Sequence, residues 1–177
     1  MLSFKAKFEL ADWLNRDLRP NTIAVATLLQ SRRADNGSWV VGNEYHYQQT
    51  YTQFVSRLSF ILFNKAWRRY KLMIPNAATL EGNGRGHKIR ERKGANLSFI
   101  DAIQPDSDIK EVHWHINMMF RRPEWMPTGS FHEIVRTVWY ASDWAMPDFK
   151  IEERKANFAA YALKDGPETL MVGPLSF

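Results

Sequence analysis

The feature that most constrains the fold is a strict alternation of side-chain character over residues 112–120. Apolar side chains occupy every second position of this segment: Val112, Trp114, Ile116, Met118 and Phe120. The positions between them are His113, His115, Asn117 and Met119. A period of two is that of a β-strand, whose successive side chains point to opposite faces. The segment therefore predicts a strand with one wholly apolar face and a second face that carries two histidines.

The composition fits one domain over residues 1–177, with residues 1–20 as a leader that packs on it. The chain has 177 residues, of which 45% are hydrophobic and 24% charged. The absence of cysteine excludes disulfide frameworks, thiol nucleophiles and cysteine zinc sites. No apolar run has the roughly 18 residues of a membrane span and no signal peptide is evident, so we expect a soluble, intracellular protein. The net charge of +5 is consistent with a phosphate-rich partner.

Other segments predict the neighbouring elements. Alternating or β-branched runs predict strands at 22–30, 76–81 and 149–152, and a short strand or hairpin arm at 38–48. Apolar residues three and four apart predict a helix over 51–71, which Pro75 stops. Ser130 and Glu133 form a capping-box signature that predicts a helix beginning at Ser130, and residues 155–164 predict a closing helix.

The resulting order is strand, helix, strand, strand, helix, strand, with one further helix. This order predicts an α+β fold with a ferredoxin-like βαββαβ antiparallel sheet, helices on one face, and an extra C-terminal helix that carries Tyr161. The other face of the sheet is expected to stay open.

The two histidines are candidate metal ligands. His113 and His115 are two residues apart in a strand, which places them about 7 Å apart on one side. Two imidazoles at that spacing can share a divalent cation, and an oxygen ligand would complete a site for Mg²⁺ or Mn²⁺. Glu81, at the end of the preceding strand, and Glu111, two residues before His113, are the two candidates for this ligand.

A tyrosine near the C-terminus is a candidate nucleophile. Tyr161 lies among alanines in the predicted closing helix, and Lys164 falls on the same helix face three residues later. A nearby ammonium favours the phenolate and helps to hold a phosphate.

These residues together resemble a known superfamily. His113-Trp114-His115 resembles the histidine–hydrophobe–histidine signature of the HUH endonucleases, and Tyr161-Ala162-Leu163-Lys164 resembles the tyrosine-x-x-lysine motif of their single-tyrosine rolling-circle replication initiators. The resemblance spans about residues 22–164, and Glu81 matches the acidic third ligand on the strand before the histidine strand.

The resemblance implies a metal-dependent endonuclease that nicks and rejoins single-stranded DNA. His113, His115 and Glu81 would hold Mg²⁺ or Mn²⁺, Tyr161 would form a 5′-phosphotyrosine link, and Lys164 would place the DNA or offset charge. The implied role is to initiate rolling-circle replication of a plasmid or phage in the cytoplasm of a bacterial host, on single-stranded DNA or an origin hairpin and with a host helicase and polymerase.

A glycine-rich basic loop at residues 82–94 predicts a DNA contact. Its basic side chains lie close to Glu81 in sequence and could clamp the phosphate backbone, which the glycines let approach. These side chains are Arg85, Lys88, Arg90, Arg92 and Lys93.

Two alternatives remain open at this stage. A single-tyrosine transposase or relaxase-like nuclease would share the chemistry and differ in the DNA it recognises. A non-catalytic nucleic-acid-binding module of the same topology would stack bases on sheet aromatics. Against the module, the expected face displays His113, His115 and Asn117.

Overall fold

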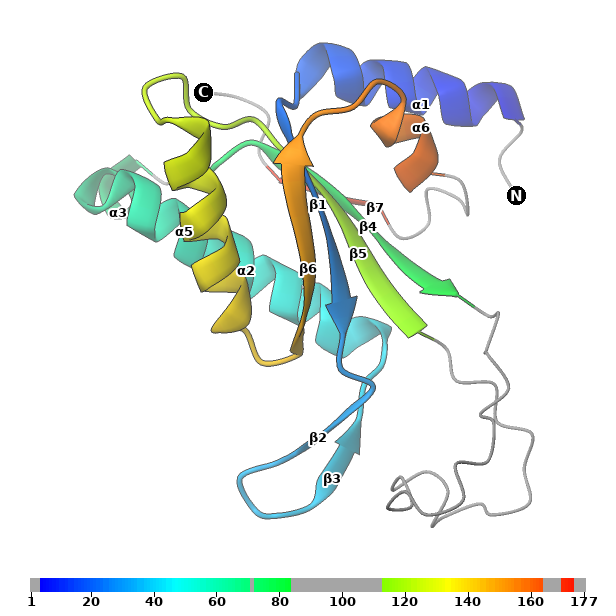
Figure 1. Cartoon of the computed structure of the whole chain (residues 1–177), viewed down its shortest axis with the longest axis vertical. Helices are drawn as coiled ribbons and strands as arrows, with labels where there is room; N and C mark the ends of the chain where they lie inside the picture. The colour runs from blue at the N-terminus through cyan, green and yellow to red at the C-terminus, as the bar shows by residue number, and fades with distance from the viewer. Residues whose placement is uncertain (1–3, 71, 84–112, 164–169, 174–177) are drawn as a thin grey trace.

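An antiparallel sheet of five strands, in the order β6-β1-β5-β4-β7, forms the centre of the fold (Figure 1). The computed structural model describes residues 4–70, 72–83, 113–163 and 170–173. The sheet strands are β1 (Thr22–Leu28), β4 (Asn76–Asn83), β5 (His113–Phe120), β6 (Ala145–Glu153) and β7 (Leu170–Val172). A separate hairpin pairs β2 (Ser31–Arg33) with β3 (Trp39–Val41). The helices are α1 (Phe4–Asp17), α2 (Glu44–Phe63), α3 (Lys65–Tyr70), α5 (Thr128–Tyr140) and α6 (Phe158–Ala162).

The alternation in residues 112–120 predicted the apolar face of β5 correctly. Ile116, Met118 and Phe120 are fully buried and belong to the main hydrophobic core. The same core takes Phe54 from α2 and Trp139 from α5, whose rings meet edge to face with centroids 5.5 Å apart. The helices α2 and α5 therefore cover this face of the sheet (Figure 1).

The expectation that the other face of the sheet stays open is wrong. Ile23 and Met119 point to the opposite face from their neighbours in the main core, and they pack in a second cluster with Leu14 of α1 and Ala162 of α6. Residues 1–20 were expected to be a leader that packs on the domain, and within them α1 forms and lies beside α6 (Figure 1). Ala11, Leu14 and Leu18 are buried in the second cluster, so the second face of the sheet is partly covered.

Two elements begin or end elsewhere than the sequence predicted. The predicted strand over 38–48 is limited to β3, because Asn43 caps α2 by accepting a hydrogen bond from the His46 amide. The long predicted helix is divided into α2 and α3 at Asn64, which has a φ of 47°. Its ψ is −121°, so this residue is outside the right-handed helical region and the helix is interrupted there.

The C-terminal half also departs from the predicted boundaries. The helix α5 begins at Thr128, so Ser130 lies inside it and the expected capping box is not formed; Pro127 occupies the N-cap without a side-chain bond. The strand β6 is longer than the predicted 149–152, and α6 is shorter than the predicted 155–164. Within the described ranges, no helix combines the length and apolar character needed to cross a bilayer.

Candidate functional site

The second face of the sheet changes from apolar to polar along its strands. Near one end it carries Ile23, Ala77 and Met119, which α1 and α6 cover. Farther along the same strands it carries Thr27 and Glu81, and His115 is the Cα partner of both. His115 thus lies at the middle of a row that crosses β1, β5 and β4.

A hydrogen-bonded chain holds one side of the His115 ring. The Nδ1 of His115 lies 3.2 Å from the Oγ1 of Thr27, and this hydroxyl donates to Oδ2 of Asp148 at 3.0 Å. Asp148 belongs to β6, so the chain connects three neighbouring strands.

The carboxylate on the other side of His115 is buried. Glu81 is 5% exposed, and Oε2 accepts a hydrogen bond of 3.2 Å from the side-chain amide of Asn117. Asn117 is itself buried and lies two residues after His115, on the same face of β5. A buried carboxylate costs free energy unless hydrogen bonds or charges compensate it, and the Asn117 amide provides one such hydrogen bond.

The helix with the predicted nucleophile packs on the same face. Thr79 of β4 donates from Oγ1 to the backbone carbonyl of Ala162 at 2.7 Å, which fixes the end of α6 over the strand. Tyr161 precedes Ala162 and is half exposed. Glu81 lies two residues beyond Thr79 on the same strand face, a spacing of about 7 Å.

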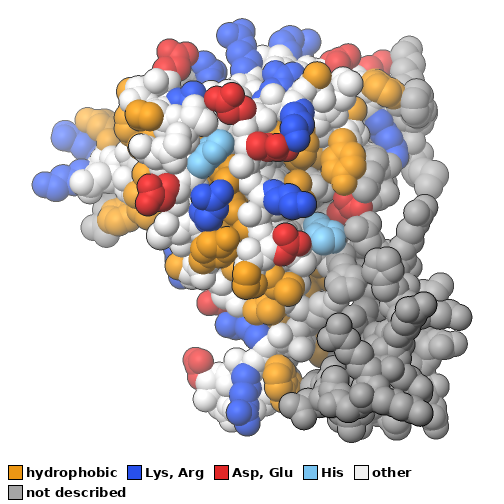
Figure 2. Space-filling view, in the orientation of Figure 1, with side chains coloured by type: hydrophobic (Ala, Val, Ile, Leu, Met, Phe, Trp, Pro, Cys, Tyr) orange, Lys and Arg blue, Asp and Glu red, His pale blue; other side chains and the backbone are white. Residues whose placement is uncertain are grey.

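Several predicted site residues lie outside what the structure describes. His113 belongs to β5 and its backbone pairs with Asn83, but its side chain is outside the described set. Glu111 and Lys164 are also outside the described residues, as are Arg85, Lys88, Arg90, Arg92 and Lys93 of the basic loop. Figure 2 shows basic and acidic side chains interspersed on the face in view, without a broad area of either sign among the described residues.

The donors brought together are of the class that binds hard divalent cations. His115 offers an imidazole and Glu81 a carboxylate from adjacent strands in direct register. Within residues 4–70, 72–83, 113–163 and 170–173 no third His, Cys, Asp or Glu completes a group of three that could hold a metal. The pair therefore fits Mg²⁺ or Mn²⁺ by its chemistry, with at least one further ligand to be supplied from elsewhere.

Thr27 and Asp148 were not singled out from the sequence, and Asn117 was named only as a polar residue on the face of the histidines. Thr27 and Asn117 carry a usable signal, because each is a polar residue within a run that otherwise predicts a buried strand. Asp148 has no such signal in the sequence, because its role depends on contact with Thr27, which is 121 positions away in the chain.

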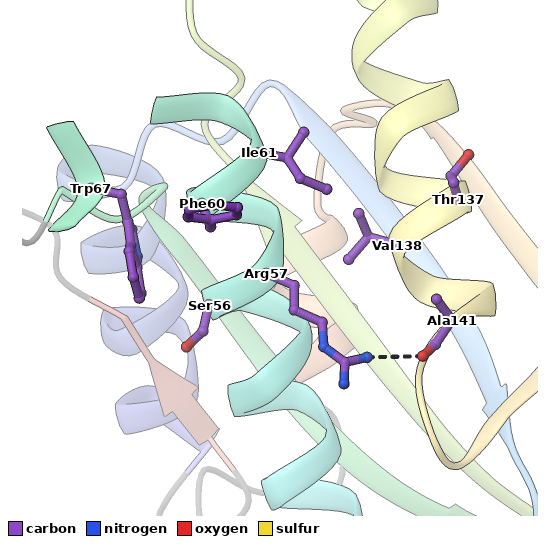
Figure 3. Close-up of a pocket in the computed structure, with 8 residues that line it drawn as sticks. All are labelled: Ser56, Arg57, Phe60, Ile61, Trp67, Thr137, Val138 and Ala141. Carbon is purple, nitrogen blue, oxygen red and sulfur yellow. Dashed lines mark hydrogen bonds between the residues drawn. The ribbon is translucent and has the colours of Figure 1, made fainter. Parts of the chain in front are cut away.

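A separate hollow lies on the outer side of the helical layer. It has a volume of about 550 Å³ and is lined by residues of α2, α3 and α5, among them Phe60, Ile61 and Trp67 (Figure 3). At its edge Arg57 donates to the backbone carbonyl of Ala141 at 2.8 Å. Its lining includes no histidine or carboxylate, so it is distinct from the polar cluster.

Comparisons of the chain with protein-family models, with curated proteins and with solved structures find no match.

Proposed function

We propose that this protein is a metal-dependent endonuclease and strand transferase of the HUH type, which nicks and rejoins single-stranded DNA through Tyr161. The observation that carries the proposal is the juxtaposition of Glu81 and His115, which are direct cross-strand partners on the sheet face against which α6 packs. The two predicted metal ligands that the structure describes thus share a surface with the helix of the predicted nucleophile.

The topology supports the same proposal. If α1, α3, α6, β7 and the β2–β3 hairpin are set aside, the chain runs β1, α2, β4, β5, α5, β6, and this order supports the proposed ferredoxin-like arrangement. The strand β5 lies between β1 and β4, the two strands that α2 connects, as in a split βαβ unit.

Each residue in the proposed reaction has a defined task. His115 and Glu81, with His113 as the resemblance implies, would bind Mg²⁺ or Mn²⁺, which supplies Lewis-acid polarisation of the scissile phosphate. The phenol oxygen of Tyr161 loses its proton to solvent and attacks phosphorus; a phosphotyrosine bond forms, the bond from phosphorus to the 3′-oxygen breaks, and that oxygen takes up a proton. In the reverse step a 3′-hydroxyl attacks the phosphotyrosine, which rejoins the strand and releases Tyr161.

The biological role proposed for this chemistry is initiation of rolling-circle replication of a plasmid or phage. A free 3′-hydroxyl left by the nick is the end from which a host polymerase extends, once a host helicase has opened the duplex. Lys164 and the basic loop at 82–94 are proposed to contact the DNA backbone. A single-tyrosine transposase or relaxase-like nuclease would use the same atoms.

The test is formation of a covalent protein–DNA adduct. The protein is incubated with Mn²⁺ and a library of circular single-stranded DNA, and the modified peptide is mapped after denaturing electrophoresis. We expect the adduct on the peptide that contains Tyr161, and its loss with chelator and in Tyr161→Phe. Tyr140→Phe is the matched control, because Tyr140 is 50% exposed and Tyr161 51%.

Two outcomes would contradict the proposal. An adduct that persists in Tyr161→Phe would show that another group is the nucleophile. Tight DNA binding without any adduct across the library would favour a non-catalytic binding module, and in that case His115→Ala should leave the Mn²⁺ dependence of DNA binding unchanged.

A further inference from the structure

The hydroxyl of Thr27 lies between two groups with different hydrogen-bonding capacities. Its Oγ1 is 3.2 Å from Nδ1 of His115 and 3.0 Å from Oδ2 of Asp148. Thr27 is 8% exposed and is the Cα partner of His115, so the backbone pairing of β1 and β5 sets this contact.

Counting protons decides the direction of both bonds. A threonine hydroxyl has one proton to donate, and an ionised aspartate only accepts. The Thr27 proton therefore goes to Asp148, and Oγ1 can accept only from Nδ1–H of His115. In the neutral ring the lone pair is then on Nε2, the ring nitrogen that does not face Thr27 in this hydrogen-bonded series.

The pairing of β1 with β6 brings Asp148 to this position. Ala26 pairs with Phe149, so one further step of the same antiparallel register places Asp148 opposite Thr27. The register shifts only beyond this point, before Leu28 pairs with Ala145. Irregularities of this kind are frequent next to functional sites.

We propose that Thr27 and Asp148 are positioning residues, which hold His115 in the Nδ1–H tautomer, so that Nε2 carries the lone pair that a divalent cation would bind. A ligating histidine commonly donates its other ring N–H to an oxygen, which fixes both tautomer and ring orientation. The assignment of the cation rests on the proposed function. The tautomer itself is a property of the protein without metal.

The tautomer is measured directly by long-range ¹H–¹⁵N NMR of protein labelled with [¹⁵N]histidine, in the absence of metal and at a pH where the ring is neutral. We expect wild-type His115 to show a protonated Nδ1 and an unprotonated Nε2. Thr27→Val keeps the side-chain shape without the hydroxyl, and Asp148→Ala frees the hydroxyl proton; both should raise the population with Nε2 protonated. Thr27→Ser should keep the wild-type pattern, and His46 and His132 serve as internal references.

The second measurement is Mn²⁺ affinity by calorimetry. Thr27→Val should weaken binding about 10- to 100-fold, the usual effect of losing an outer-shell partner, and Thr27→Ser should stay close to wild type. Asp148 is exposed, so we expect Asp148→Ala to fold normally. This variant therefore tests the proposal even if Thr27→Val does not fold.

The outcomes separate the two hypotheses. A wild-type His115 with Nε2 protonated, or a tautomer that neither Thr27→Val nor Asp148→Ala alters, overturns the positioning role. If the tautomer pattern is as expected but Mn²⁺ does not bind, the positioning role of Thr27 and Asp148 is supported. The metal site of the proposed function is then contradicted.

Discussion

At the scale of single residues, this protein buries polar groups where its second sheet face turns from apolar to polar. Glu81 and Asn117 are both at most 5% exposed and are bonded to each other. Such a pair is stable in the interior, because each side chain provides a hydrogen bond that water would otherwise provide. If one side chain is replaced by an apolar one, the other loses this hydrogen bond while it stays buried.

The first prediction concerns that pair. Asn117→Leu should destabilise the protein by about 1–3 kcal/mol, since the buried Glu81 carboxylate loses a donor. The double variant Glu81→Leu/Asn117→Leu should lose less than the sum of the two single variants. Urea unfolding of the four proteins measures this coupling, and strictly additive losses would show that the two side chains do not interact.

The second prediction concerns alkaline stability. Burial raises the pKa of Tyr47 to about 12, whereas an unfolded tyrosine titrates near pH 10. Between these values the unfolded chain has lost the proton and the folded one has kept it, so the stability due to this group is complete below about pH 10 and decreases as the pH approaches 12.

Tyr47→Phe removes this titration and should make the decline in unfolding free energy above pH 10 shallower. It should also cost about 1 kcal/mol at pH 7, because the hydrogen bond from Tyr47 to the Leu29 carbonyl is lost. Its exposed neighbour provides the control: Tyr45→Phe should keep the wild-type slope. An identical slope in both variants would argue against a contribution of Tyr47.

At the scale of elements, periodicity predicted β1, β4, β5 and the centre of the long helix well, and it predicted the short or capped elements poorly. The strand β5 and helix α2 have many residues that agree with one period. The helix α1 was missed although Ala11, Leu14 and Leu18 recur at helical spacing, because other apolar residues such as Phe8 lie off this stripe; the second sheet face shows what the stripe covers. The capping box at Ser130 was wrong because a four-residue signature recurs inside helices.

The third prediction tests the docking of α1. Leu14 is fully buried between α1 and the second sheet face, so Leu14→Ala should destabilise the protein by about 2–5 kcal/mol. Asp12→Ala, at an exposed position of the same helix, should change stability by no more than about 0.5 kcal/mol. Thermal or urea unfolding measures the stability of both variants. If α1 were only loosely attached, Leu14→Ala and Asp12→Ala would lose the same small amount of stability.

At the scale of the whole molecule, the sheet has a protected centre and exposed edges. The strands β1 and β5 have hydrogen-bonded neighbours on both sides and helices on both faces. The strand β7 is a three-residue edge strand, and the β2–β3 hairpin pairs apart from the sheet. The site spans this architecture, because Thr27, Asp148, His115 and Glu81 come from four different strands.

The fourth prediction follows from this arrangement. In native-state hydrogen exchange, amides of β1 and β5 should exchange slowest, near the free energy of global unfolding, and those of β7 and the β2–β3 hairpin should exchange far faster. Exchange followed by mass spectrometry of peptides resolves these segments. Equal protection of β7 and β5 would contradict the assignment of β7 as a weakly held edge.

The sequence by itself determined the two faces of β5, and it offered two acidic residues, Glu81 and Glu111, as partners of the histidines. Alternation is a local property, so it places His115 opposite the core before any fold is known. Sequence reasoning could not specify the covering of the second face by α1 and α6, or the contact of Thr27 with Asp148. Those depend on strand order and register, which bring together residues 121 positions apart, and no local pattern records contacts at that separation.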